Sequence, residues 1–215
     1  MPTDTWDKLP ASRRDRVLEA AEREFGAHGY SGGSLNVIAR EAGVAKGSLF
    51  QYFDDKLDFY VHVCTVATER MRGELVPILL GLDLTRPFGP WLADMLSAWI
   101  AYFRMHPIER GIVAATNLEM DPEVRAAVRN VANAAYLEVL RPVMVAFRDR
   151  GDLKPDVDVD VLLAYLLLLA PHLALAPYLP GIDPVLGLLD ADERHSDDVA
   201  RRLVSILEAA VVPEP

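Results

Sequence analysis

The chain has 215 residues, of which 51% are hydrophobic and 25% charged, a composition that supports a folded core and argues against disorder. Its formal net charge of −10 excludes a protein that coats nucleic acid through overall positive charge, but leaves room for a small basic face. The single cysteine, Cys64, excludes an intramolecular disulfide framework and favours a reducing, cytoplasmic compartment. The first residues, MPTDTWDKLP, lack the basic and then apolar run of a secretory signal.

Helix signals follow one another along the chain, and alternating β-branched runs bounded by hairpin turns are absent from the sequence. We therefore expect an all-α fold. Capping residues, glycines and prolines predict helices over 13–28, 35–42, 45–53, 56–80, 88–105, 107–118, 121–150, an apolar segment from 159, and 195–212. Short helices thus precede long ones, which predicts a small N-terminal domain, residues 1–55, and a larger domain, residues 56–215.

Two of the short helices are joined by a tight turn that contains glycine. Residues 34–53 read SLNVIAREAGVAKGSLFQYF, in which Ser34 is a good N-cap and Gly43 ends the first helix. Two short amphipathic helices joined in this way form a helix-turn-helix, whose second helix can enter the major groove of DNA. We therefore expect this segment to bind double-stranded DNA.

The second helix of the motif should expose one side. At 100° per residue, Ala45, Leu49 and Phe53 share its inward side, while Gly47 and Gln51 point almost opposite. Gln51 can pair bidentately with adenine, and Lys46 can reach guanine acceptors or a phosphate. The candidate DNA-binding residues are Ser34, Asn36, Lys46, Gly47, Ser48, Phe50, Gln51, Tyr52 and Lys56. The alternative is that they are ordinary solvated polar residues of a small helical module.

The segment that contains the predicted helix-turn-helix carries a family resemblance. The segment GYSGGSLNVIAREAGVAKGSLFQYFDDKLDF resembles the N-terminal signature of the TetR/AcrR family of bacterial transcription regulators. The shared features are Gly29-Tyr30, Ser34, Ile38-Ala39, Ala42-Gly43-Val44, Gly47-Ser48-Leu49, the residues from Phe50 to Phe53, and Lys56. Phe50 departs from the family pattern, which usually has tyrosine there, so a phosphate contact would fall to Tyr52 or Lys56 instead.

The resemblance implies a homodimer. Each subunit would have a three-helix DNA-binding domain followed by a six-helix domain for ligand binding and dimerisation. We expect a repressor that leaves an inverted-repeat operator when a small effector binds, and the apolar side chains of the larger domain indicate a hydrophobic effector.

Aromatic and methionine side chains recur at i+4 spacing in the residues WLADMLSAWIAYF, 91–103. By itself such a stripe is more typical of a plain core, but the resemblance implies a cavity between these helices, mostly apolar with a few polar groups. The candidate pocket residues are Trp91, Met95, Trp99, Tyr102, Asn117, Tyr136, Met144 and His172.

The apolar segment after residue 159 and the last helix are the candidates for the dimer interface, where two helices from each subunit would form a four-helix bundle. The candidate residues are Leu162, Leu166, Leu169, Val199, Leu203, Ile206 and Leu207. The alternative is that they form a core within one chain.

Residues 161–180 contain no charged side chain and are long enough to cross a bilayer. Pro171, Pro177 and Pro180 interrupt them, so we expect a buried helix and no membrane partner. Two other interpretations stay open: a membrane-associated protein anchored by this stretch, and a helical small-molecule-binding protein without a functional DNA head.

The sequence offers little for catalysis. The five histidines have no metal-ligand spacing, and the sequence contains no GxSxG, Walker A or dinucleotide-binding glycine pattern. We therefore expect no catalytic residues, no metal and no cofactor. The prediction is a DNA-binding transcriptional regulator rather than an enzyme.

Overall fold

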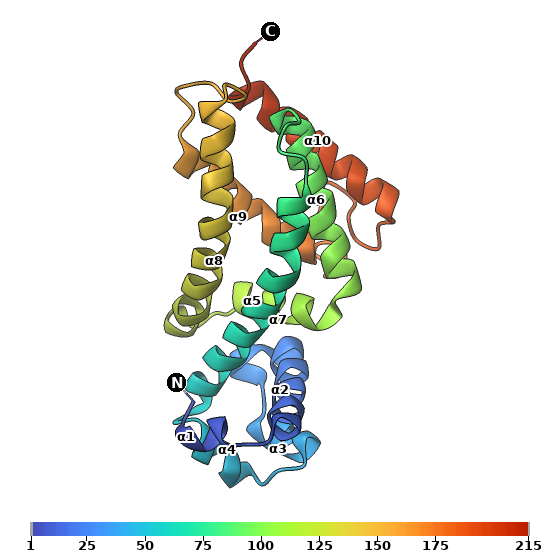
Figure 1. Cartoon of the computed structure of the whole chain (residues 1–215). Coiled ribbons are helices and arrows are strands. Elements are labelled where there is room, and N and C mark those ends of the chain that lie inside the picture. Colours follow the sequence, from blue (N-terminus) through green and yellow to red (C-terminus); the bar gives the residue numbers. More distant parts are fainter. Residues whose placement is uncertain (1, 215) are drawn as a thin grey trace. The chain divides into compact units, whose positions relative to one another are not determined.

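The computed structural model describes residues 2–214, and this part of the chain folds into ten helices with no β-strand (Figure 1). The all-α prediction is therefore confirmed. The helices are α1 (Asp4–Asp7), α2 (Ala11–Gly32), α3 (Leu35–Ala42), α4 (Lys46–Tyr52), α5 (Lys56–Gly81), α6 (Phe88–Met105), α7 (Pro107–Asn117), α8 (Pro122–Asp149), α9 (Val159–Leu175) and α10 (Glu193–Val211). The sequence analysis did not predict α1.

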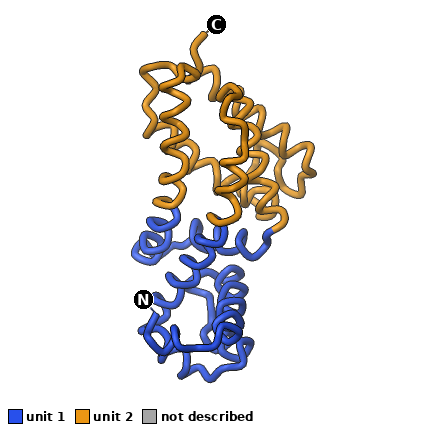
Figure 2. The backbone as a smooth tube through the Cα atoms, in the orientation of Figure 1, with its two compact units in different colours: residues 1–71, 106–132 blue, residues 72–105, 133–215 orange. Residues whose placement is uncertain are grey.

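The chain divides into two compact units (Figure 2). Unit 1 contains the residues up to Met71 together with His106–Ala132, and unit 2 contains Arg72–Met105 together with the residues from Asn133 on. Helix α7 therefore belongs to the same unit as the helix-turn-helix, although α6 separates them in the sequence. The boundary at residues 55 and 56, which separates the predicted DNA-binding domain from the predicted ligand-binding and dimerisation domain, stays a prediction.

Unit 1 is built around one face of α2. Val17, Ala21 and Phe25 recur at spacings of four residues on that face and are fully buried. The ring of Phe25 lies edge-on against Tyr60 of α5, with 5.0 Å between ring centroids. Burying a large apolar side chain contributes about 1.5–3 kcal/mol, so this face fixes α2 against α5.

Helices α2 and α7 approach each other through glycine. A Cβ atom added to Gly111 of α7 would lie 3.2 Å from the Cα atom of Gly26 in α2. Beside this contact, Arg70 of α5 pairs with the buried carboxylates of Glu22 at 3.0 Å and Glu109 at 2.8 Å. Burial raises the pKa of Glu22, and the Arg70 guanidinium opposes this effect. Backbone contact and ion pairs together hold three helices in one unit.

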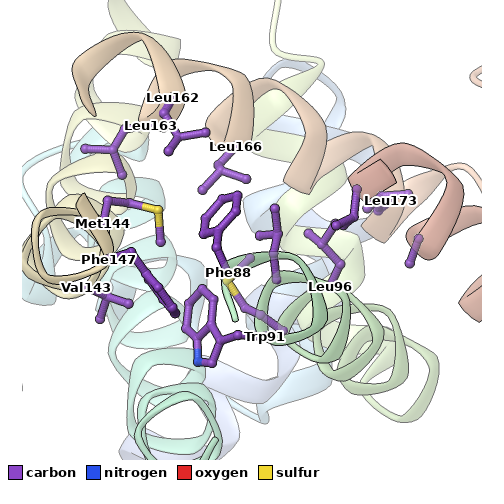
Figure 3. Packing of buried hydrophobic residues seen from close by; sticks show 14 of the residues in the cluster. Phe88, Trp91, Leu96, Val143, Met144, Phe147, Leu162, Leu163, Leu166 and Leu173 are labelled. Carbon is purple, nitrogen blue, oxygen red and sulfur yellow. The ribbon is translucent and has the colours of Figure 1, made fainter. Parts of the chain in front are cut away.

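The core of unit 2 is apolar and rich in aromatic rings (Figure 3). Trp91 of α6 lies against Phe147 of α8 at 5.1 Å between centroids, and Phe88 meets the same ring at 5.5 Å. Leu163 and Leu166 of α9 belong to this cluster and are buried. The apolar stripe of α6 therefore packs as a core between helices of the same unit.

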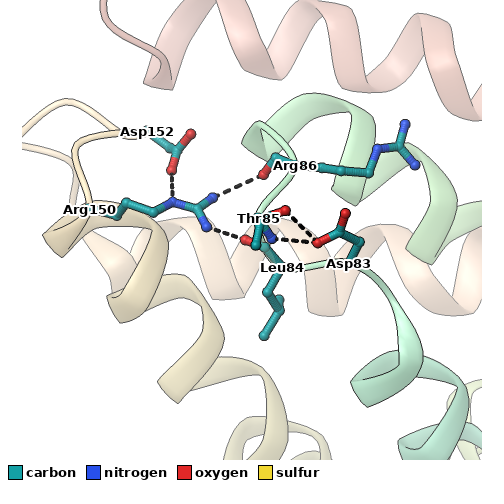
Figure 4. Close-up of polar contacts among 6 residues, drawn as sticks. All are labelled: Asp83, Leu84, Thr85, Arg86, Arg150 and Asp152. Carbon is teal, nitrogen blue, oxygen red and sulfur yellow. Dashed lines mark hydrogen bonds and ion pairs between the residues drawn. The ribbon is translucent and has the colours of Figure 1, made fainter.

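Arg150, the residue that follows α8, holds the loop between α5 and α6 within unit 2 (Figure 4). Its guanidinium donates to the carbonyl oxygens of Leu84 and Arg86 and pairs with Asp152. Within the loop, the carboxylate of Asp83 accepts hydrogen bonds from the backbone N–H and the hydroxyl group of Thr85, at 2.9 and 2.6 Å. The loop is therefore a closed turn.

The long apolar stretch does not form one continuous helix. Helix α9 has 17 residues and ends at Leu175, ahead of two of the three prolines, and turns follow it. Across residues 2–214, no helix combines the length and the apolar character that a membrane span requires.

Candidate nucleic-acid interface

The local sequence shapes the turn between α3 and α4. The Ser34 hydroxyl group accepts a hydrogen bond from the Val37 N–H at 3.4 Å, which is the bond expected of an N-cap. The N–H of Ser34 itself donates to the Glu24 carboxylate at 2.9 Å. Gly43 ends α3 with a φ of 67°, a left-handed conformation that glycine adopts without strain. The Val44 N–H then donates to the Ala39 carbonyl at 2.9 Å, which closes the turn.

Helix α4 packs on one side and exposes the other. Leu49 is 2% exposed and Phe53 is 1% exposed, whereas Gly47, Phe50 and Gln51 face solvent. Leu49 and Phe53 are buried as the 100° periodicity predicts, but Ala45, which was predicted on the same side, is exposed because it is the N-cap that precedes α4. Side chains on the outer face are therefore free to meet base edges.

Other candidate residues surround this face. Asn36 near the start of α3 and Lys46 at the start of α4 are exposed, and Ser48 is half-buried. Ser34 is half-buried, and its hydroxyl group already caps α3. Asn36 and Lys46 therefore remain available to a ligand.

Two candidates lie differently from the prediction. Tyr52 is only 3% exposed, and its ring lies 5.8 Å from that of Trp6, so its hydroxyl group is not presented as a replacement for the phosphate contact missing at Phe50. The Lys56 ammonium lies 4.8 Å from the ring centroid of Tyr30, and burial lowers the pKa of Lys56. Both side chains contribute to packing within unit 1.

Sequence reasoning missed Thr3 and Trp6, which contact the end of α4. The available signal was weak: a threonine before the short run DTWD, an isolated tryptophan, and a proline at position 10. Helix α1 has four residues, too few to show a helical periodicity.

The predicted pocket residues fall into two groups. In unit 2, Trp91, Met95, Tyr102 and Met144 are buried, while the indole N–H of Trp99 donates to the Ala170 carbonyl at 2.8 Å. The ring of Trp99 also meets that of Tyr136, with 5.4 Å between centroids. Asn117 belongs instead to unit 1, where its amide donates to the Val113 carbonyl of its own helix at 2.8 Å.

Helices α9 and α10 of unit 2 frame an apolar groove of about 710 Å³. Its lining residues are Val157, Asp158, Val161, Leu162, Tyr165, Leu166, Leu168, Leu169, His172, Leu186, Leu203, Ile206, Leu207, Ala210 and Val211. Leu168 is 75% exposed and Ile206 is 74% exposed. Six of the seven candidate interface residues line this groove, and the seventh, Val199, is fully buried in the core of the unit. Val199 therefore has no surface to offer a partner.

The helix-turn-helix with an exposed second helix defines a DNA-binding protein. Residues 17–63 match the family model described as bacterial regulatory proteins, tetR family. This N-terminal segment is therefore similar to the DNA-binding domain of that family, and the chain is a DNA-binding transcriptional regulator.

Similar proteins extend this likeness to the rest of the chain. The HTH-type transcriptional repressor AcnR of Corynebacterium efficiens is 26% identical over 92% of this chain and 100% of its own length. The HTH-type transcriptional repressor Rv1474c of Mycobacterium tuberculosis is 29% identical over 91% of this chain and 100% of its own. The structure of the fatty acid degradation regulator FadR from Bacillus halodurans aligns with a TM-score of 0.71 at 16% identity, over 92% of this chain and 96% of the other. The last likeness is one of fold.

Proposed function

We propose that the chain is a homodimeric repressor that binds an inverted-repeat operator and leaves it when a hydrophobic small molecule binds. The observation that carries the proposal is the exposed outer face of α4, with Gln51, Gly47 and Phe50 turned to solvent over a buried inner face. The names of the relatives, which are transcriptional repressors, support the direction of regulation.

On DNA, α4 would enter the major groove. Gln51 would pair with an adenine, and Lys46 would meet a guanine or a phosphate. Phe50, which is 50% exposed, would contact the methyl group of a thymine, because an apolar ring has no hydrogen bond to offer there. In a dimer, two such helices would read half-sites about 34–36 Å apart.

The apolar groove of α9 and α10 supports self-association. Leu168 and Ile206 are large apolar side chains with about three quarters of their surface exposed, at 75% and 74%. Contiguous exposed apolar surface of this kind marks an interaction site. A second copy of the chain would cover it with the same two helices and form a four-helix bundle.

The proposed effector is small and hydrophobic. In unit 2, α6 and α8 supply aromatic side chains, with Trp99 and Tyr136 5.4 Å apart between ring centroids. FadR of Bacillus subtilis, which has the same fold with a TM-score of 0.67, was crystallised in complex with stearoyl-CoA. An effector can release DNA only by its difference in affinity between the DNA-bound and the released conformation.

The test is selection of bound duplexes from a random pool, followed by binding at several salt concentrations. We expect an inverted repeat to emerge and affinity for it to fall with salt, since phosphate contacts release counterions. Recovery of unrelated duplexes with no shared pattern would contradict the proposal.

The compartment that we propose is the cytoplasm, where bacterial operators lie.

A further inference from the structure

The last carbonyl groups of α4 receive hydrogen bonds from a distant part of the chain. The end of every α-helix leaves carbonyl groups without a partner inside the helix. Here the backbone N–H of Thr3 donates to the Tyr52 carbonyl at 2.9 Å, and the Thr3 hydroxyl group donates to the Gln51 carbonyl at 2.6 Å. One residue near the start of the chain therefore closes the helix that carries Gln51.

Trp6 supports the same helix end by packing. Its side chain is 3% exposed, and its ring lies 5.8 Å from that of Tyr52 and 5.0 Å from that of Phe53, between centroids. On another side, the ring of His62 from α5 stands edge-on to Trp6 at 5.5 Å. The tryptophan therefore joins the end of α4 to α5.

A further hydrogen bond anchors this segment to α2. The guanidinium of Arg14 donates to the Asp7 carbonyl at 2.8 Å. The Leu9 N–H donates to the Trp6 carbonyl at 3.1 Å and closes the turn that follows α1. Residues 3–9, which we call the N-terminal clamp, are thus held at both ends.

Helix α4 needs external support. It has seven residues and no side-chain hydrogen bond at its N-cap, Ala45. Isolated helices shorter than about 12 residues are marginal in water. The position of α4 therefore depends on tertiary contacts, and the clamp supplies those at its C-terminal end.

We propose that Thr3 and Trp6 are positioning residues for DNA recognition, which act by holding the C-terminal end of α4 so that Gln51 is presented in one orientation. This inference rests on the proposed function of α4 as the DNA-reading helix. Base-edge hydrogen bonds require accurate geometry, whereas phosphate attraction is less demanding. Loosening the clamp should therefore weaken specific binding and spare non-specific binding.

The main test is Thr3→Val, which removes the hydroxyl group and keeps the shape of the side chain. Thr3→Ser keeps a hydroxyl group, and Thr5→Val is the matched control because Thr5 is exposed on α1, which Thr3 precedes as the N-cap. Binding is measured on a duplex selected by the parent protein and on a scrambled duplex of the same composition. A hydrogen bond contributes about 0.5–1.5 kcal/mol, so Thr3→Val should weaken binding to the selected duplex by about two- to tenfold. Thr3→Ser and Thr5→Val should match the parent, and binding of all variants to the scrambled duplex should be unchanged.

Amide hydrogen exchange provides a readout that does not involve DNA. In Thr3→Val and in Trp6→Ala, exchange should accelerate in peptides from α4 and stay unchanged in peptides from α3, and Trp6→Phe should restore part of the protection. The proposal would be wrong if amide exchange in α4 stayed unchanged, or if the variants lost equal affinity for the selected and the scrambled duplex. If the parent itself failed to prefer its selected duplex, the proposed function would fail, while the exchange experiment would still decide on the clamp.

Discussion

Units 1 and 2 present opposite kinds of surface. On the outer face of α4, unit 1 exposes Gln51 and Lys46 above a tightly packed core. Along α9 and α10, unit 2 exposes Leu168 and Ile206, which form the edge of an apolar groove. Polar groups are suited to a hydrated, charged partner, whereas apolar surface gains free energy only when another apolar surface covers it. The contrast is the one expected from the proposed function, in which unit 1 binds DNA and unit 2 binds a second copy of the chain.

The largest effect is expected where a charge enters the apolar surface of unit 2. Ile206→Glu would place a carboxylate in the proposed interface, and burying an unpaired charge costs several kcal/mol. We expect the dimer dissociation constant to rise at least about a hundredfold in sedimentation equilibrium. Ser205→Glu is the matched control, since Ser205 is exposed on the same helix but does not line the groove. If the Ile206→Glu protein sedimented like the parent, the dimer would not form through this groove.

A second change tests whether α7 belongs with unit 1. In Gly111→Ala the new Cβ atom would lie 3.2 Å from the Gly26 backbone, which cannot move away as a flexible side chain can. Overpacking of this kind costs about 1–3 kcal/mol in the free energy of unfolding, measured with urea. In contrast, Gly73→Ala meets no atom within 4 Å in the middle of α5 and should stabilise the protein by up to about 1 kcal/mol. Equal effects of the two substitutions would argue against a close α2–α7 contact.

A third change separates base contacts from phosphate contacts in unit 1. Gln51→Ala should cost about 1–3 kcal/mol on the selected duplex and relax the preference at one base pair. Lys46→Ala serves as the comparison: in a phosphate role it should weaken all duplexes evenly and lower the salt slope by about one. If Gln51→Ala bound all duplexes like the parent, the outer face of α4 would not read bases.

The smallest effect concerns pH and the aromatic support of α4. Burial lowers the pKa of His62 from its ordinary value of 6.5, so the folded protein binds fewer protons than the unfolded chain at and below that pH. Stability should therefore fall as the pH drops from about 7.5 to 5. His62→Phe keeps an aromatic ring and removes the titration, so its thermal midpoint should fall less over the same range. An identical pH profile for both proteins would show that His62 does not contribute.

Capping residues, glycines, prolines and the spacing of apolar residues predicted most of the helices. These features act on the backbone within a few residues, so the sequence alone records them. The ranges 35–42 and 88–105 agree with α3 and α6 as observed. Gly43 ended α3 as predicted, since only a residue without a side chain adopts its left-handed conformation at no cost. The outward face of α4 followed from periodicity alone.

The burial of individual side chains could not be predicted in this way. Tyr52 looked available for a phosphate, but Trp6, distant in sequence, covers it. Val199 shared the apolar stripe of α10 with Ile206, yet the first is fully buried and the second is 74% exposed. A stripe gives the direction of an apolar face and does not say which residues another helix reaches.

The sequence by itself therefore determined that the chain is helical, where its turns fall, and that a short helix carrying Gln51 could read DNA. These properties depend on backbone preferences and on spacings of three or four residues. Only the tertiary structure decided that Thr3 closes that helix and that α7 packs on α2 through two glycines. Such contacts join residues far apart in the chain, and their free energy depends on packing in three dimensions, which no local pattern records.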